Sequence, residues 1–457
     1  MTTFADRSLE EQIAQWRVFV RSRQSLHGPD VEELEGLLRH QLVALTEAGL
    51  AGDEAFLVAV KRMGSLDARS REFARAHSAR LWKQLVMAPD ADQSANTSHV
   101  EMLVVLGLAI AAALAVKLPE LFGFRLSPQE ELPPFYARNA SLFVFPLLAV
   151  YFMWKRGWNA VSGLWLALPF AAGAVFANLF SFPTGSNTEV LTALHLPIAL
   201  WLAVGFAYVR GRWLADGGRM NFVRFSGELA IYYVLIALGG GVLTGFTFML
   251  FAAIGMNAEW FVGPWLIPCG AAGAVIIASW LVEAKQSVIE NMAPVLTKLF
   301  TPLLTVLLLM FLATMAWTGS PINVEREVLI GFDLLLALVV GLVLYAASAR
   351  DPEAPPDVFD GLQLLLVVSA LVVDAVALWA IAARISEFGF TPNRVAALGE
   401  NLILLVNLAW SAWLYASLLR HRGSFAALER WQVAYLPVYS AWAALVVVVF
   451  PPLFGYQ

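Results

Sequence analysis

The chain has 457 residues, of which 59% are hydrophobic and 14% charged, and its formal net charge is −5. A soluble domain usually carries about a quarter charged residues, so most of this chain must be solvated by lipid rather than by water. The acidic balance argues against a nucleic-acid partner. The single cysteine, Cys269, excludes a disulfide framework and a thiolate metal site.

The first part of the chain, residues 1–87, predicts a small soluble helical domain. Leucines at three- and four-residue steps form one apolar helical stripe: Leu34, Leu37, Leu38, Leu42 and Leu45. Shorter patterns predict helices around residues 9–20, 54–63 and 67–86. Residues 88–98, rich in Asp, Ser, Asn and Thr, predict a linker. No long apolar stretch precedes His99, so we expect the first span itself to direct insertion, without a cleavable signal peptide.

The remainder, residues 99–457, predicts a transmembrane domain. Apolar stretches of about 20 residues recur along it, the length that crosses ~30 Å of hydrocarbon. A backbone in lipid must satisfy its own hydrogen bonds, and no alternating strand pattern is present, so the spans are helices. The predicted fold class is all-α, a polytopic bundle of about eleven spans: 99–118, 139–154, 160–180, 189–209, 227–254, 260–282, 297–317, 328–348, 361–383, 393–419 and 436–455.

The distribution of basic residues predicts how this bundle is oriented. With the N-terminal domain inside, the inner connections and their flanks hold twelve Lys and Arg residues, against six on the outer side. Positive residues favour the cytoplasmic side of a membrane. We therefore expect the N-terminus in the cytoplasm and, after an odd number of spans, the C-terminus in the periplasm or outside the cell.

Two segments carry a resemblance to known families. Arg384-Ile-Ser-Glu-Phe-Gly-Phe-Thr-Pro-Asn-Arg394, followed by a long apolar helix, resembles the signature of the bacterial domain-of-unknown-function 4153 membrane family. Glu33-Leu-Glu-Gly-Leu-Leu, Ala48-Gly-Leu, Asp53-Glu-Ala-Phe and Lys61-Arg-Met-Gly64 resemble the permease prefix domain. These resemblances imply a helical module in front of a protein of the bacterial cytoplasmic (inner) membrane. They imply no known reaction.

The motif around Gly389 also makes physical sense as a helical hairpin. Thr391 can cap the tenth span, Pro392 suits its first turn, and Gly389 permits a tight reversal. The motif's polar groups are expected at the outer surface, where they anchor the hairpin or form the rim of a ligand site: Arg384, Glu387, Asn393 and Arg394.

Three carboxyl groups fall inside predicted spans eight, nine and ten. At 1.5 Å per residue, Asp333, Asp374 and Glu400 lie roughly 9–14 Å below the outer ends of their helices. No Lys or Arg lies at that depth, so the acids must be protonated, reach water through a cavity or hold a cation. We predict a polar pocket in the outer half of the bundle, and the alternative is that these groups join helices as structural hydrogen bonds. The candidate pocket residues are Asp333, Asp374, Glu400, Asn401, Asn407 and His195.

Missing motifs narrow the function further. The sequence has no phosphate loop, dinucleotide fingerprint, zinc-protease helix or nucleophile elbow. We therefore predict no enzymatic activity, no catalytic residues, no cofactor and no metal.

Two functional hypotheses remain. One is a transporter or channel-like permease for a small solute or an ion, with an outward-facing acidic pocket. The other is a membrane sensor or scaffold whose cytoplasmic domain, residues 1–87, binds a protein partner. Membrane lipid is an expected partner in both cases, and the sequence leaves a homo-oligomer open.

The orientation can be tested with fusions. Alkaline phosphatase is active only outside the cytoplasm, so a fusion after Gln457 should be active and a fusion after Arg350 silent. Enzyme activity in intact cells measures both. The opposite result at either position would refute the predicted number of spans.

Overall fold

The computed structural model describes residue 13 and residues 28–47, 55–56, 58–59, 91–126, 133–183, 185–213, 218–253, 255–284, 292–318, 326–350 and 354–457. Every regular element within these ranges is a helix. The chain divides into two compact units, Met1–Glu101 and Met102–Gln457.

The first unit contains helix α2, Gly28–Glu47. Its leucines Leu38, Leu42 and Leu45 are buried, as the apolar stripe predicts, and Ile13 and Phe56 are buried too. The side chains of two further leucines of the stripe, at positions 34 and 37, and the helix expected over 67–86 lie outside the described residues. Residues 91–98 of the predicted linker form the first turns of helix α5.

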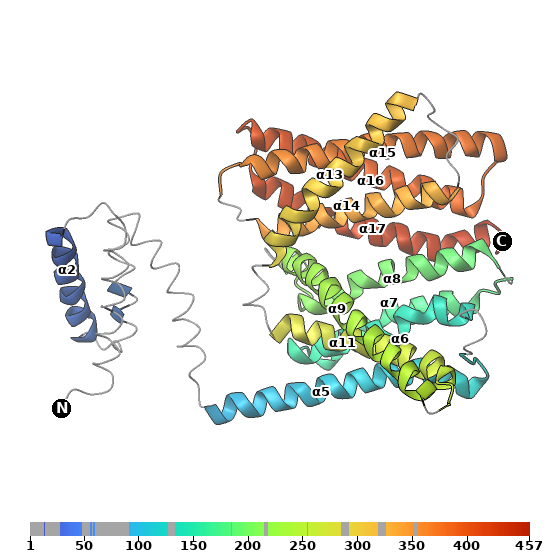
Figure 1. Cartoon of the computed structure of the whole chain (residues 1–457), viewed down its shortest axis with the longest axis horizontal. Helices are drawn as coiled ribbons and strands as arrows, with labels where there is room; N and C mark the ends of the chain where they lie inside the picture. The colour runs from blue at the N-terminus through green and yellow to red at the C-terminus, as the bar shows by residue number, and fades with distance from the viewer. Residues whose placement is uncertain are drawn as a thin grey trace. The chain divides into compact units, whose positions relative to one another are not determined.

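The second unit is a bundle of long helices (Figure 1). Among the described residues, ten helices are long and apolar enough to cross a membrane, so the chain is an integral membrane protein. The elements are α5 Ala91–Lys117, the 3-10 helix η1 Leu118–Phe122, α6 Pro134–Lys155, α7 Ala160–Leu179, α8 Asn187–Tyr208, α9 Gly218–Ala253, α10 Glu259–Phe261, the π-helix η2 Val262–Leu266, α11 Ile267–Ala284, α13 Met292–Thr318, α14 Arg326–Ala349, α15 Val358–Phe388, α16 Pro392–Leu419 and α17 Phe425–Leu453.

Helix α7 is the remaining predicted span, and its stretch Gly163–Leu179 is apolar. The whole helix has 20 residues, so at 1.5 Å per residue it covers about 30 Å, the thickness of a typical hydrocarbon core. The eleven spans expected from the sequence are therefore ten candidate spans and one shorter apolar helix.

The two ends of α7 nevertheless contact opposite ends of α8. Just before α7, Trp158 Nε1 donates to the carbonyl oxygen of Ala207 at 3.2 Å, at the C-terminal end of α8. Just after α7, the ring of Phe180 packs 5.6 Å from that of Tyr456. The carbonyl of Tyr456 accepts a hydrogen bond from Ser186, the N-cap of α8. Helix α7 thus runs antiparallel to α8 along its whole length.

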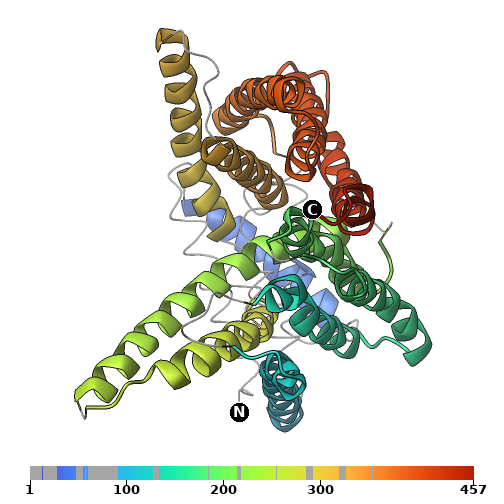
Figure 2. The same cartoon turned by 90° about the vertical axis from the view of Figure 1, so that its right-hand side faces the viewer.

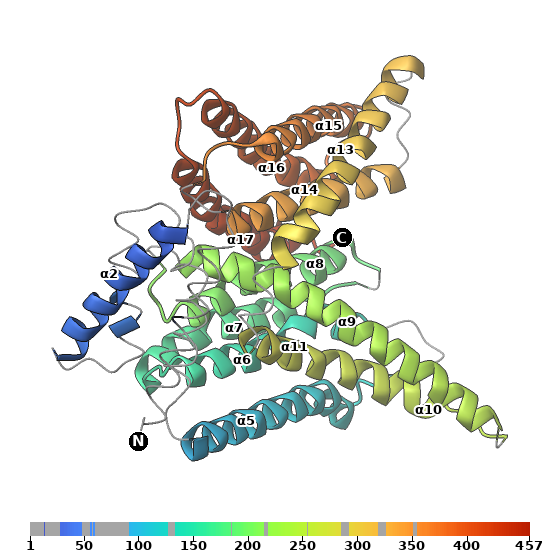
Figure 3. The ribbon, with the colours of Figure 1, turned by 60° about the vertical axis from the view of Figure 1, so that its left-hand side comes forward.

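The bundle consists of two lobes, each with its own hydrophobic core. The first lobe contains α5 to α9 and α11, and the second contains α13 to α17 (Figure 3). Helix α8 of the first lobe packs along α17 of the second. A small core of Leu191, Ala396, Val446 and Phe450 lies where α8, α16 and α17 meet. This seam holds the lobes together.

Buried ion pairs stabilise one end of the bundle. Arg156, just after α6, donates to both carboxylate oxygens of Glu283 on α11, at 2.9 Å each. Arg350, just after α14, pairs with Asp360 of α15 at 2.9 and 2.8 Å. The Glu283 and Asp360 side chains are each only 2% exposed. A charged side chain costs the least free energy near the ends of membrane helices, and both pairs lie at helix ends.

A close contact between α9 and α14 gives a test of the packing between lobes. A Cβ atom at Gly227 would meet Tyr345 Cδ2 at 2.5 Å, whereas one at Gly239 of the same helix would meet nothing within 4 Å. We expect Gly227→Ala to lower the free energy of unfolding by about 1–3 kcal/mol through overpacking. Gly239→Ala should be neutral or stabilise by up to about 1 kcal/mol. Thermal unfolding in detergent measures both, and a G227A protein as stable as G239A would contradict this packing.

Candidate functional site

The structure brings three of the predicted carboxyl groups together in the second lobe. Asn401 Nδ2 on α16 donates to Asp333 Oδ1 on α14 at 2.8 Å. Asp374 on α15 and Glu400 on α16 each interact electrostatically with Asp333. We call Asp333, Asp374, Glu400 and Asn401 the acid cluster. It joins three consecutive helices without a Lys or Arg among its members.

The members of the acid cluster lie at different distances from the ends of their own helices. Asp333 and Glu400 lie about 10–12 Å along the axis from the first residues of α14 and α16. Asp374 lies about 21 Å from the C-terminal end of α15, because this helix continues to Phe388 and not to the predicted residue 383. Asp374 is therefore near the middle of its helix.

Asp374 is the most isolated member of the cluster. Its side chain is 0% exposed, and neither carboxyl oxygen has a hydrogen-bond partner among the described residues. Helix α15 packs against α13, α14 and α16. An ionised carboxylate left unpaired in such surroundings would cost several kcal/mol.

Asn407 belongs to a different polar network. Its Nδ2 donates to Gln432 Oε1 at 3.4 Å, and Gln432 Nε2 donates to Ser411 Oγ at 2.7 Å. Ser411 in turn donates to the Asn407 carbonyl at 2.7 Å. All three residues are buried, so this network links α16 to α17. Asn407 was predicted to lie at the floor of an acidic pocket. The structure places it instead in the network between α16 and α17.

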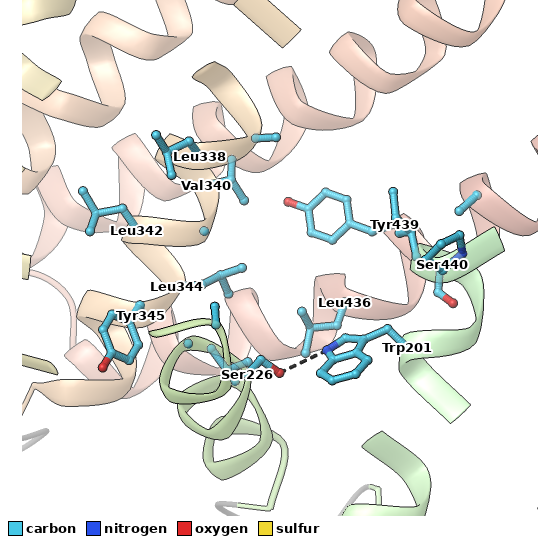
Figure 4. Close-up of a pocket in the computed structure, with 18 of the residues that line it drawn as sticks. Trp201, Ser226, Leu338, Val340, Leu342, Leu344, Tyr345, Leu436, Tyr439 and Ser440 are labelled. Atoms are coloured by element: carbon cyan, nitrogen blue, oxygen red, sulfur yellow. Dashed lines mark hydrogen bonds between the residues drawn. The ribbon is translucent and has the colours of Figure 1, made fainter. Parts of the chain in front are cut away.

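A cavity of about 1060 Å³ lies between the two lobes. It is lined by α6, α8 and α9 from the first lobe and by α13, α14, α16 and α17 from the second. Figure 4 shows the wall formed by α14 and, opposite it, Tyr439 extending from α17 towards α14. We call this space the interlobe cavity. Its wall is mainly hydrocarbon, including Leu338, Val340, Leu342 and Leu344.

Only two of the predicted pocket residues line the interlobe cavity. Glu400 reaches it from the second lobe and His195 from the first. His195 is 7% exposed, and its Nδ1 forms a 2.8 Å hydrogen bond with the carbonyl of Leu191. Glu400 therefore connects the acid cluster to the cavity. The other predicted pocket residues do not line it: Asp333, Asp374, Asn401 and Asn407.

The cavity also occupies a different level from the predicted pocket. Its lining comes from residues 222–231 of α9, 296–304 of α13 and 337–345 of α14. These stretches lie in the half of the bundle that the sequence predicts to face the cytoplasm, or near its middle. The sequence gives no direct signal for this space, because its lining comes from helices that are far apart along the chain.

The outer-surface motif closes a hairpin. Thr391 caps α16 by accepting from the Arg394 backbone, Pro392 is in its first turn, and Gly389 adopts φ +77°. These three roles are confirmed. Arg394 also donates to the carbonyls of Phe388 and Gly389, at 3.1 and 2.8 Å. Its guanidinium thereby satisfies carbonyls at the end of α15, as the structural interpretation of the motif expects.

The remaining motif residues lie around this hairpin. Asn393 Nδ2 donates to Asn187 Oδ1 at the start of α8, at 2.7 Å, so the motif also links the two lobes. Glu387 is exposed and Arg384 half-buried. Neither lines the interlobe cavity. The alternative role of this motif, the rim of a ligand site, stays a prediction.

Metal binding by the acid cluster finds no geometric basis in the described part of the chain. No group of three or more His, Cys, Asp or Glu side chains there is arranged to hold a metal ion.

A known family model matches part of the second lobe. Residues 329–453 match the family model described as Domain of unknown function (DUF4153). The match extends from α14 to α17 and includes the acid cluster and the hairpin motif. It supports the family resemblance seen in residues 384–394, for this part of the chain. The comparison with curated proteins found no match, and neither did the comparison with solved structures.

Proposed function

We propose that the chain is a proton-linked permease that moves a small solute through the interlobe cavity. The observation that carries this proposal is Asp374, a buried carboxyl without a hydrogen-bond partner, in the same helix group as Glu400 at the cavity wall; both interact electrostatically with Asp333. Ligand sites commonly lie at interfaces between structural units, and a cavity of this size fits such a site.

The acid cluster supplies the proton-handling part of the proposal. Asp374 and Glu400, on α15 and α16, each interact electrostatically with Asp333 on α14. On α13, the third packed helix, the charged residue is Lys298, which is exposed and lies near Thr301. Thr301 binds Gln363 near the other end of α15, so Lys298 is remote from Asp374. Inside the bundle, Asp374 has a lower free energy when it is protonated than when it is ionised. A change in the packing or the charge around Glu400 would alter that state.

The proposed setting is the bacterial cytoplasmic membrane, with the N-terminus in the cytoplasm. In that orientation the buried pairs Arg156–Glu283 and Arg350–Asp360 lie on the cytoplasmic side, where basic residues are favoured. Residues 1–87 would then be a cytoplasmic domain of the permease-prefix type.

A second candidate is a membrane sensor whose N-terminal domain binds a protein partner. The observation that favours it is the separate compact unit Met1–Glu101. The two candidates differ in one respect that can be measured. A permease moves its solute in liposomes that contain no other protein, and a sensor does not.

The proton-linked step can be tested with Asp374→Asn. The purified chain is placed in liposomes with a pH dye inside, and a panel of amino acids, sugars, organic acids and alkylamines is added singly. For the wild type we expect at least one class to change the internal pH. Asp374→Asn keeps size and hydrogen-bonding capacity but removes the titratable proton, so this signal should be lost.

Controls separate loss of function from loss of fold. Glu387→Gln removes an exposed carboxyl from the same helix and should transport like the wild type. The unfolding free energy of D374N should stay within about 1 kcal/mol of the wild type. If D374N folds and still couples solute to protons, Asp374 is a structural carboxyl and the proposal fails.

A further inference from the structure

Two of the hydroxyl groups that line the interlobe cavity are engaged within the protein. Ser226 Oγ accepts from Trp201 Nε1 at 3.1 Å, a bond drawn in Figure 4, and donates to the Phe222 carbonyl at 2.8 Å. Ser440 Oγ donates to the Ala199 carbonyl at 2.8 Å. The hydroxyls of Tyr345 and Tyr439 and the indole Nε1 of Trp442 have no hydrogen-bond partner among the described residues. These three groups are fewer than the polar groups of a sugar, several of which would stay unpaired in this space at a large cost, so the cavity selects against such a solute.

The charge at the wall of the cavity is acidic. Within the described lining, Glu400 is the one acidic residue, and neither Lys nor Arg is present. His195 is the one basic side chain there, and its Nδ1 is engaged by the Leu191 carbonyl. Glu400 also lies beside another carboxyl, Asp333. A cationic group next to Glu400 would complement this charge.

The rest of the wall suits a hydrocarbon chain. Apolar side chains of α14 face Leu436 and Tyr439 of α17 across the space (Figure 4). Its volume of about 1060 Å³ is at the upper end of the roughly 300–1,000 Å³ of ligand pockets. Each methylene that leaves water for such a wall adds to binding. The cavity can therefore bury a long alkyl chain.

Two of the helices that line the cavity also present apolar faces to the bilayer. Helices α9 and α13, which both contribute to the lining, diverge from each other (Figure 2). Their outer faces are apolar and exposed, for example at Val234 and Leu238 of α9 and at Leu303 and Val306 of α13. Lipid would cover these faces in a membrane. An amphipathic molecule dissolved in the bilayer would thus reach the space between the two helices without crossing water.

From these observations we infer that the cavity binds an amphipathic amine. Its alkyl chain lies along the hydrocarbon wall of α14 and α17, and its ammonium group pairs with the Glu400 carboxylate. As a statement about the transported substrate, this inference rests on the proposed permease function. As a statement about binding, it stands on the cavity itself.

Photolabelling of the purified full-length chain tests the position of the alkyl chain. The probe is hexadecylamine with a diazirine at the middle of its chain, and labelled peptides are identified by mass spectrometry. Gly341 lines the cavity with no atom within 4 Å of an added Cβ, so Gly341→Trp should fill the space without a clash at that atom. Gly331, on the same helix, is equally open but does not line the cavity.

Labelling of cavity peptides should fall about tenfold or more in G341W and stay within about twofold in G331W. Should G341W fail to fold, Ala337→Trp replaces it, because Ala337 also lines the cavity. Labelling that avoids the cavity in the wild type, or that is equal in the two Trp variants, would overturn the inference.

A second comparison tests recognition of the amine. The wild type should be labelled about tenfold more by the amine than by the same probe with a hydroxyl group, and Glu400→Gln should remove this preference. Equal labelling by amine and alcohol would refute the pairing with Glu400. Displacement of the amine by ordinary phospholipid at equal concentration would identify the occupant as a bilayer lipid and overturn the inference.

The binding inference and the permease proposal fail in different ways. If a sugar or an amino acid changes the internal pH in the liposome assay, the permease stands and the amine is refuted as its substrate. If the amine labels the cavity as expected but no solute is linked to protons, the binding site stands and the permease is refuted.

Discussion

The hydrocarbon region of a bilayer offers no hydrogen-bond partner, and the arrangement of polar groups in this chain follows from that constraint. Charged pairs such as Arg156–Glu283 lie at helix ends. Uncharged amides deeper in the bundle satisfy one another, as Asn407 and Gln432 do between α16 and α17. Among the carboxyl groups of the described residues, Asp374 departs from this pattern, because it is fully buried and neither of its oxygens has a partner. A group that departs from so general a constraint is the natural candidate for a function.

The two lobes give this exception a connection to a binding site. The acid cluster lies wholly in the second lobe, and Glu400 is its member at the interlobe cavity. The opposite wall belongs to α8 and α9 of the first lobe, with His195 among its residues. A ligand between the lobes would change the field at Glu400 and, through Asp333, at Asp374. Binding and proton transfer would then be linked by these side chains.

The sequence predicts those features that depend on local physics. Apolar runs locate the helices because each helix satisfies its own backbone in lipid, and the cap at Thr391 depends on residues within one turn. Features that depend on packing were predicted less well. Asn407 pairs with Gln432, which lies on another helix, and α15 continues to Phe388 rather than ending at the predicted residue 383. The cavity comes from helices that diverge in three dimensions, which a one-dimensional pattern does not contain.

The central claim is that the space between the lobes is a hydrocarbon-lined site reached from lipid, and spin-label accessibility tests it most directly. The cysteine is replaced by Cys269→Ser, and a nitroxide is attached at Ala337→Cys in the cavity or at the exposed Glu387→Cys as an aqueous reference. Power saturation compares collisions with oxygen, which prefers lipid, and with a water-soluble nickel chelate. The label at position 337 should collide often with oxygen and rarely with nickel. Nickel collisions at 337 as frequent as those at 387 would show a water-filled passage and contradict the account.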